Sequence, residues 1–218
     1  MTIKDKLYHQ IKKITQLLVA HSIAIDQNFP RINGNEIVWN KYKNLAFTLK
    51  DEEYHILYNN CLKGQDYNLL LIDGALIQLK YSFSRREITS HVLSYYPNPS
   101  IENYQNNPQE FENTYYGNEP FSYIIDKSTV IFPLRFDFSD VHTEIIHPYV
   151  HATFGNYRDC RIPISKPISP YNFINFILRN FYFDKFKDCE EDCNFLCDIR
   201  MENTITNKEK NILHFHIE

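Results

Sequence analysis

The sequence predicts an α+β protein whose mainly antiparallel sheet is covered by helices on one face. Three observations lead to this fold class: apolar residues recur at helical spacing near the N-terminus, apolar and polar residues alternate through the middle of the chain, and a second amphipathic segment follows Ser169-Pro170. The 218 residues can bury one sizeable core, so we expect a single domain spanning residues 1–218.

The N-terminal segment has the pattern of an amphipathic helix. Its apolar residues recur at steps of three, four and seven: Ile3, Leu7, Ile11, Ile14, Leu18 and Ile25. A second helix is predicted from about Asp51, where three successive acidic residues suit the positive end of the helix dipole. It runs to about Leu62, and Gly64 is the residue expected to end it.

A β-hairpin is predicted next. Residues 69–72 lead into Asp73-Gly74, a pair preferred in two-residue turns with positive φ. The return strand alternates, with Ala75, Ile77, Leu79, Tyr81 and Phe83 on one face and Gln78, Lys80 and Ser82 on the other. A third strand follows at about residues 87–96.

Residues 97–120 differ in character, since they hold four prolines and many Asn and Gln residues. Long polar loops in compact domains are usually functional or disordered. We expect a long loop here, and it is the place where the single domain could divide into two subdomains.

The alternation returns after this loop. Strands are predicted at about residues 130–138, 147–154 and 161–165, and Ser169-Pro170 has the N-cap and first-position proline of a helix. If that helix covers the apolar side of the strands, the opposite side carries Arg135, His147, Tyr149, His151, Thr153 and Arg161. A last strand at 213–217 would add His214 and His216 to the same side.

Composition restricts the function classes. Only five glycines are present and no Gly-rich phosphate-binding motif occurs, which argues against dinucleotide or P-loop binding. The net charge of −4 means that nucleic-acid binding would depend on a local basic patch. No apolar run has the length of a membrane span, and an odd number of cysteines, five, without a signal sequence favours the reducing cytoplasm.

Three stretches carry a family resemblance. HPYVHATFG, then CRIPISKPISPYNFINFILRNFY, together with the LIDGALIQLKYSF hairpin, resemble an uncharacterised bacterial family, domain of unknown function 2290. The likeness covers most of the chain. It implies a role in anti-phage defence and a partner helicase encoded alongside, and it implies no established catalytic residues.

The residues themselves suggest one catalytic constellation. His151 and Thr153, separated by one residue on a strand, are similar to half of the motif of the two-histidine phosphoesterases, in which two imidazoles act as acid and base on a phosphodiester. The second half would be His214 or His216 in LHFHI, although that segment has His where Ser or Thr is expected. Thr153, Arg158 and Arg161 would bind phosphate, and Arg135, His147 and Tyr149 are expected to contact phosphate or nucleic acid as well. The alternative is a set of hydrogen-bonded strand histidines without catalytic function.

No organic cofactor is predicted, and the histidines leave a divalent metal open. His147 and His151 would lie about 13 Å apart on a straight strand, too far to share one ion unless Pro148 bends the chain. Cys189, Cys193 and Cys197 repeat every four residues on one helix face, which is more typical of core packing than of a zinc site.

A basic segment supplies the second functional signal. Between residues 150 and 187, six basic residues (Arg158, Arg161, Lys166, Arg179, Lys185 and Lys187) stand against two acidic ones. Basic groups interleaved with aromatic rings suit single-stranded nucleic acid, and a solvated helix face explains the pattern equally well. Two hypotheses therefore stand: a nucleic-acid-facing defence component that could cleave phosphodiesters, and a non-catalytic adaptor or sensor that docks a helicase or a phage protein.

Overall fold

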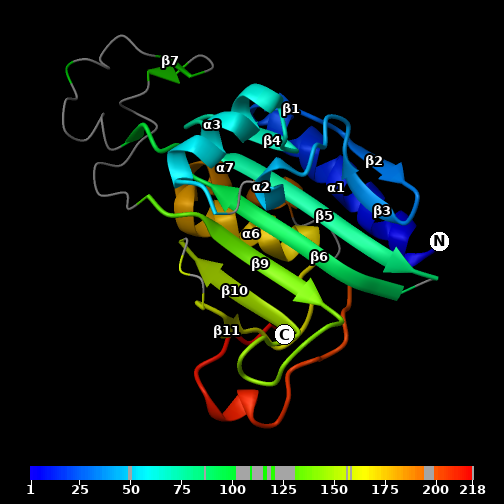
Figure 1. Cartoon of the computed structure of the whole chain (residues 1–218). Helices are drawn as coiled ribbons and strands as arrows, with labels where there is room; N and C mark the ends of the chain where they lie inside the picture. Colours follow the sequence, from blue (N-terminus) through cyan, green and yellow to red (C-terminus); the bar gives the residue numbers. More distant parts are fainter. Residues whose placement is uncertain are drawn as a thin grey trace.

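The computed structural model describes residues 1–48, 51–85, 87–101, 131–155, 157, 159–193 and 199–217, with residue 109 and the pairs 115–116 and 119–120. Within these residues the protein is built on a nine-stranded sheet whose main path runs β1-β4-β5-β6-β9-β10-β11 (Figure 1). Every strand pairing in it is antiparallel. The predicted α+β fold with a mainly antiparallel sheet is confirmed.

The strands have the following bounds. They are β1 (Ala24–Gln27), β2 (Pro30–Asn33), β3 (Glu36–Trp39), β4 (Leu69–Leu71), β5 (Leu76–Ser84), β6 (Glu87–Tyr96), β9 (Leu134–Ser139), β10 (Val150–Phe154) and β11 (Ile162–Pro163), with β7 (Tyr115–Tyr116) and β8 (Glu119–Pro120) forming a separate pair. The helices are α1 (Ile3–Ala20), α2 (Leu45–Thr48), α3 (Tyr54–Gly64), α6 (Pro170–Phe181), α7 (Phe183–Cys193) and the short 3-10 helix η2 (Glu209–Asn211).

One face of the sheet is covered by α1 and α6, which lie against each other behind the strands in Figure 1. The apolar stripe of α1 meets the inward residues of β5, among them Ile77 and Leu79, in one buried cluster. On β9, the ring of Phe136 packs edge-on against Phe173 of α6, with centroids 5.7 Å apart. Burying such a side chain stabilises the fold by about 1.5–3 kcal/mol, so this face holds the main core.

The opposite face, which we call the open face, is covered at one end only. There α3 packs Leu57, Tyr58 and Cys61 against Leu76 of β5 and Tyr96 of β6 in a second, smaller core. The short helix α2 lies in front of the sheet on this side (Figure 1). The remainder of the open face carries polar side chains from the central strands.

Several predicted elements agree closely with the structure. The alternation of β5 and the extent of β6 are confirmed, and Gly74 has the positive φ of 87° expected at the hairpin turn. Helix α6 begins at Ser169, whose hydroxyl accepts a hydrogen bond from the backbone N–H of Asn172 at 3.1 Å.

Other elements differ from the prediction. Helix α1 ends at Ala20 and Ser22 turns the chain with φ 54°, so Ile25 lies in β1 and is 38% exposed. Strands β1 to β3 and helix α2 were not predicted, because each spans only four residues, too few for a periodic signal. The predicted strand at 213–217 is reduced to a parallel bridge between Phe215 and Ile164.

Most of the predicted loop at residues 97–120 lies outside the described residues, so the division into subdomains stays a prediction. Among the helices that the structure describes, none combines the length and the apolar character that a bilayer crossing requires.

A buried histidine ties the start of α6 to the sheet. His91 of β6 is 1% exposed on the helix-covered face, where its Nε2 accepts a hydrogen bond from the backbone N–H of Ile168 at 3.0 Å. Its other ring nitrogen, Nδ1, lies 3.2 Å from the carbonyl oxygen of Phe136 and donates to it. The bond that Nε2 accepts requires the neutral imidazole, and burial lowers the pKa of His91 to about 4.

We therefore predict that the protein loses stability in acid because His91 becomes protonated on unfolding. The unfolded chain takes up a proton at His91 as the pH falls through about 6.5, whereas the folded protein takes it up only near pH 4. Between these two pH values the free energy of unfolding therefore falls, by up to about 3 kcal/mol. Urea unfolding of the wild type and of His91→Gln, whose amide supplies a donor and an acceptor without titrating, measures this contribution. An equal pH dependence in both proteins would contradict it.

Candidate functional site

Strand register arranges the polar residues of the open face in two rows. In one row, Lys80 of β5 lies beside Val92 of β6, which pairs with Asp137 of β9, and Asp137 pairs with His151 of β10. In the next row, Gln78, Ser94, Arg135 and Thr153 follow one another across the same strands. Cross-strand pairs share a face, so these side chains stand together on the side away from α1 and α6.

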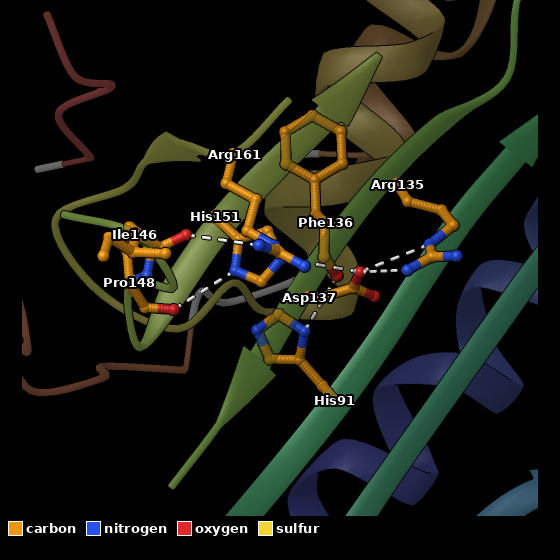
Figure 2. A network of polar contacts seen from close by, with 8 residues as sticks. All are labelled: His91, Arg135, Phe136, Asp137, Ile146, Pro148, His151 and Arg161. Atoms are coloured by element: carbon orange, nitrogen blue, oxygen red, sulfur yellow. Dashed lines mark hydrogen bonds and ion pairs between the residues drawn. The ribbon is translucent and has the colours of Figure 1, made fainter. Parts of the chain in front are cut away.

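At the β10 end of the first row, His151 lies against Asp137. His151 is 4% exposed, its Nε2 lies 3.8 Å from the Oδ2 of Asp137, and its Nδ1 lies 3.2 Å from the carbonyl oxygen of Pro148 (Figure 2). Burial lowers the pKa of His151, against the opposing pull of the Asp137 charge. The imidazole is therefore neutral at pH 7.

Asp137 is in turn bound by Arg135 from the same strand. The Nη2 and Nε atoms of Arg135 donate to the Oδ2 of Asp137 at 2.6 and 3.2 Å, and the carboxylate raises the pKa of the guanidinium. The second carboxylate oxygen, Oδ1, is buried and has no hydrogen-bond partner among the described residues. The Arg135 side chain remains 39% exposed, and its described hydrogen bonds engage Nε and Nη2, so Nη1 can donate to a ligand.

His147 reaches His151 because the chain bends before β10, the case in which the sequence allowed the two histidines to come close. Strand β10 starts at Val150, and His147 lies in a tight turn where its backbone forms two hydrogen bonds with Thr143. The predicted separation of about 13 Å assumed a continuous strand. The two imidazole rings instead make an edge-on contact with centroids 5.0 Å apart, so the assumption of a straight strand was wrong.

Arg161 completes the cluster from the segment before β11. Its Nη1 donates to the carbonyl oxygen of Ile146 at 3.2 Å, which holds the turn that carries His147. Figure 2 shows Arg161 beside His151, and its positive charge is one of the causes that lower the pKa of that imidazole. Tyr149 is half-buried nearby and stacks on His142 with ring centroids 3.5 Å apart.

The remaining predicted site residues lie elsewhere. Beside β11, the Nδ1 of His214 lies 2.9 Å from the carbonyl oxygen of Ile212, while His216 is exposed and lines a separate depression with Lys166 and Arg200. No contact between these two histidines and the His147–His151 pair is found among the described residues. Thr153 is half-buried opposite Arg135, and Arg158 lies outside the described residues.

The predicted basic segment does not gather on one surface. Arg161 lies at the open face, whereas Arg179 and Lys187 belong to α6 and α7, where they sit over the rings of Phe186 and Phe183. Lys166 is 9% exposed. Charge for a nucleic acid at the open face would therefore come from Arg135 and Arg161 rather than from the whole segment.

Among the side chains that the structure describes, no group of three or more His, Cys, Asp and Glu residues that could hold a metal ion is found. Cys189 is buried in the main core, as predicted from its spacing, and the Cys197 side chain lies outside the described residues.

The sequence prediction missed two features of this site. It gave Asp137 no role, although an acid two residues from an arginine on an alternating strand shares that arginine's face. It also missed a cavity of about 280 Å³ next to Arg135, because one wall comes from β3 and the segment after it.

Comparisons with known proteins give one positive result. A search of the curated proteins and a search of the solved structures returned no match. Residues 23–217, however, match the family described as an uncharacterized conserved protein, DUF2290. This match contains every strand of the sheet and begins after α1, and the chain belongs to the DUF2290 family.

Proposed function

We propose that this protein contacts nucleic acid through the open face of its sheet, as a component of a bacterial anti-phage defence system that acts with a helicase. The observation that carries the nucleic-acid contact is the pair of guanidinium groups, Arg135 and Arg161, on either side of the Asp137–His151 pair. Guanidinium groups are well suited to phosphate oxygens. The defence role and the helicase partner rest on the family resemblance alone.

The charge balance makes this contact a local one. The whole chain carries a net charge of −4, so its overall field does not attract phosphates. At the open face, Arg135 is partly neutralised by Asp137, whereas the described contacts of Arg161 are to a neutral carbonyl. Arg161 is therefore the stronger phosphate ligand of the two.

Replacing Arg161 tests this assignment. Arg161→Gln is expected to weaken binding of a fluorescent single-stranded oligonucleotide, measured by anisotropy, and to reduce the slope of log affinity against log salt by about 0.7, as the loss of one phosphate contact requires. Arg161→Lys keeps the charge and most of the slope. Arg31→Gln, on exposed β2, removes the same charge from a different surface and leaves the affinity unchanged. If Arg161→Gln and Arg31→Gln lost equal affinity for the oligonucleotide, binding would depend on the net charge of the protein and not on Arg161.

In a catalytic version of this proposal, His147 and His151 cleave a phosphodiester bond of the nucleic acid. The neutral His151 is suited to accept a proton, its Nδ1 lies 3.2 Å from the Pro148 carbonyl oxygen, and the nearby His147 supplies the second imidazole that phosphodiester cleavage by acid and base requires. Sequence spacing alone pairs His151 with His214 or His216, and the described contacts favour His147 for that role. The alternative, a non-catalytic adaptor that docks the helicase, is favoured by the burial of His151, which leaves 4% of it exposed.

A cleavage assay separates the two forms. If the pair is catalytic, the wild type degrades a single strand, with or without added Mg²⁺, and His151→Asn and His147→Gln slow the reaction by about 100-fold or more. His55→Gln, at a histidine whose side chain is 58% exposed on α3, serves as the matched control with unchanged rate. Binding without any cleavage, combined with co-purification of the helicase, would support the adaptor. Equal cleavage by His151→Asn and wild type would remove His151 from any catalytic role.

A further inference from the structure

A cavity of about 280 Å³ opens on the open face beside Arg135. Its floor is formed by β5 and β6, and its other wall by β3 and the segment leading to α2. Binding pockets for small molecules commonly enclose about 300–1,000 Å³, so this cavity is at the small end and suits a group of one ring system rather than a dinucleotide.

The walls of the cavity are largely aromatic and apolar. The rings of Trp39 and Tyr42 meet edge-on, with centroids 4.9 Å apart, and Tyr96 and Val92 contribute from β6. Val92 is only half-buried, although its neighbours along β6 are enclosed. A half-exposed valine between aromatic rings provides a surface that a flat ring can cover.

The segment that carries two of these rings is fixed by a buried carboxylate. Asp66 is 0% exposed and accepts hydrogen bonds from the Nε1 of Trp39 at 3.0 Å and from the backbone N–H groups of Lys43 and Leu45 at 2.8 and 2.7 Å. Three donors compensate its charge, so Asp66 builds the wall and offers little repulsion to an anionic ligand. The cavity is thus held open by the fold itself.

The rim of the cavity carries two cations and an amide. Lys80 donates to the Tyr42 hydroxyl at 2.8 Å and forms an ion pair with Glu36 at 2.9 Å, and Arg135 is paired with Asp137. The Tyr42 hydroxyl donates to the side-chain oxygen of Asn44 at 2.7 Å, which leaves the Asn44 NH₂ group as a donor for a base edge. The Lys80 ammonium also lies over the Tyr42 ring, 4.9 Å from its centroid, so rings and cations stand together here as a nucleobase with its phosphate requires.

We infer that this cavity receives one base of the bound strand, while Arg135 and Lys80 contact the adjoining phosphate; this inference rests on the proposed function. Both rim cations already have acidic partners, so their attraction for a phosphate is modest. An isolated nucleotide therefore binds weakly. A strand that also reaches Arg161 gains from several linked contacts, which favours a polymer over a free nucleotide. Arg135, which lines the cavity and binds Asp137, connects the two parts of the surface.

Comparing a normal strand with an abasic strand of equal length tests the inference. The wild type is expected to bind single-stranded oligothymidylate about tenfold more tightly than the abasic deoxyribose phosphate polymer, because the abasic polymer has no base to place in the cavity. Val92→Phe fills the cavity and is expected to bring this ratio close to one, with the affinity for the abasic polymer unchanged. Val19→Phe makes the same substitution on the exposed surface of α1, and its ratio stays at the wild-type value.

Thermal unfolding and a second variant guard against a substitution that simply unfolds the protein. Thermal unfolding verifies that Val92→Phe is folded, and Tyr42→Leu, which removes a wall rather than filling the space, replaces it if that variant is unstable. If the folded variant keeps the wild-type ratio of normal-strand to abasic affinity, the cavity does not receive a base. The proposed contact between the open face and nucleic acid is not affected by that result. If neither polymer binds, both proposals fall. Binding of thymidine monophosphate alone, sensitive to Val92→Phe and without binding of strands, would overturn the polymer form and identify a free nucleotide as the ligand.

Discussion

The alternation of side chains along β5, β6 and β9 is the constraint on which the rest of the structure depends. Successive residues of a strand point to opposite faces. When one residue packs against α1 or α6, its neighbours along the strand must therefore point to the open face. Phe136 packs on Phe173, and the residues on either side of it, Arg135 and Asp137, are therefore presented away from the helices. A slip of one residue in β9 would exchange the core and the polar surface.

Buried polar groups limit what the open face can do. The Arg135–Asp137 pair is only partly exposed, and removing either partner would leave a charge poorly compensated. His151 is neutral and enclosed between this pair and the turn at 143–147. Such a group can accept a proton or fix its neighbours, but it has little surface with which to hold a large ligand. The exposed part of the surface is supplied by Arg161, His147 and the cavity rim, so binding there does not require the centre to open.

Local patterns account for what could be predicted from the sequence. The β5–β6 hairpin follows from alternation and from the Asp73-Gly74 turn, and α6 follows from Ser169, Pro170 and its apolar stripe. The position of His147 could not be predicted, because the turn depends on its bridge to Thr143 and on Arg161, fifteen residues after Ile146. The cavity could not be predicted from the sequence either, because its wall is positioned by Asp66, more than twenty residues beyond Trp39. Contacts of this kind leave no periodic signal.

Photo-crosslinking of a bound single strand tests most directly whether the open face is the binding surface. A strand carrying a photoreactive base is irradiated with the protein, and the attached peptides are identified by mass spectrometry. Attachment to Tyr42, Tyr149 or the segment around Arg161 is the predicted result, since these residues lie along the open face. Attachment confined to the opposite side, at Tyr8 of α1 or Phe183 of α7, would contradict it.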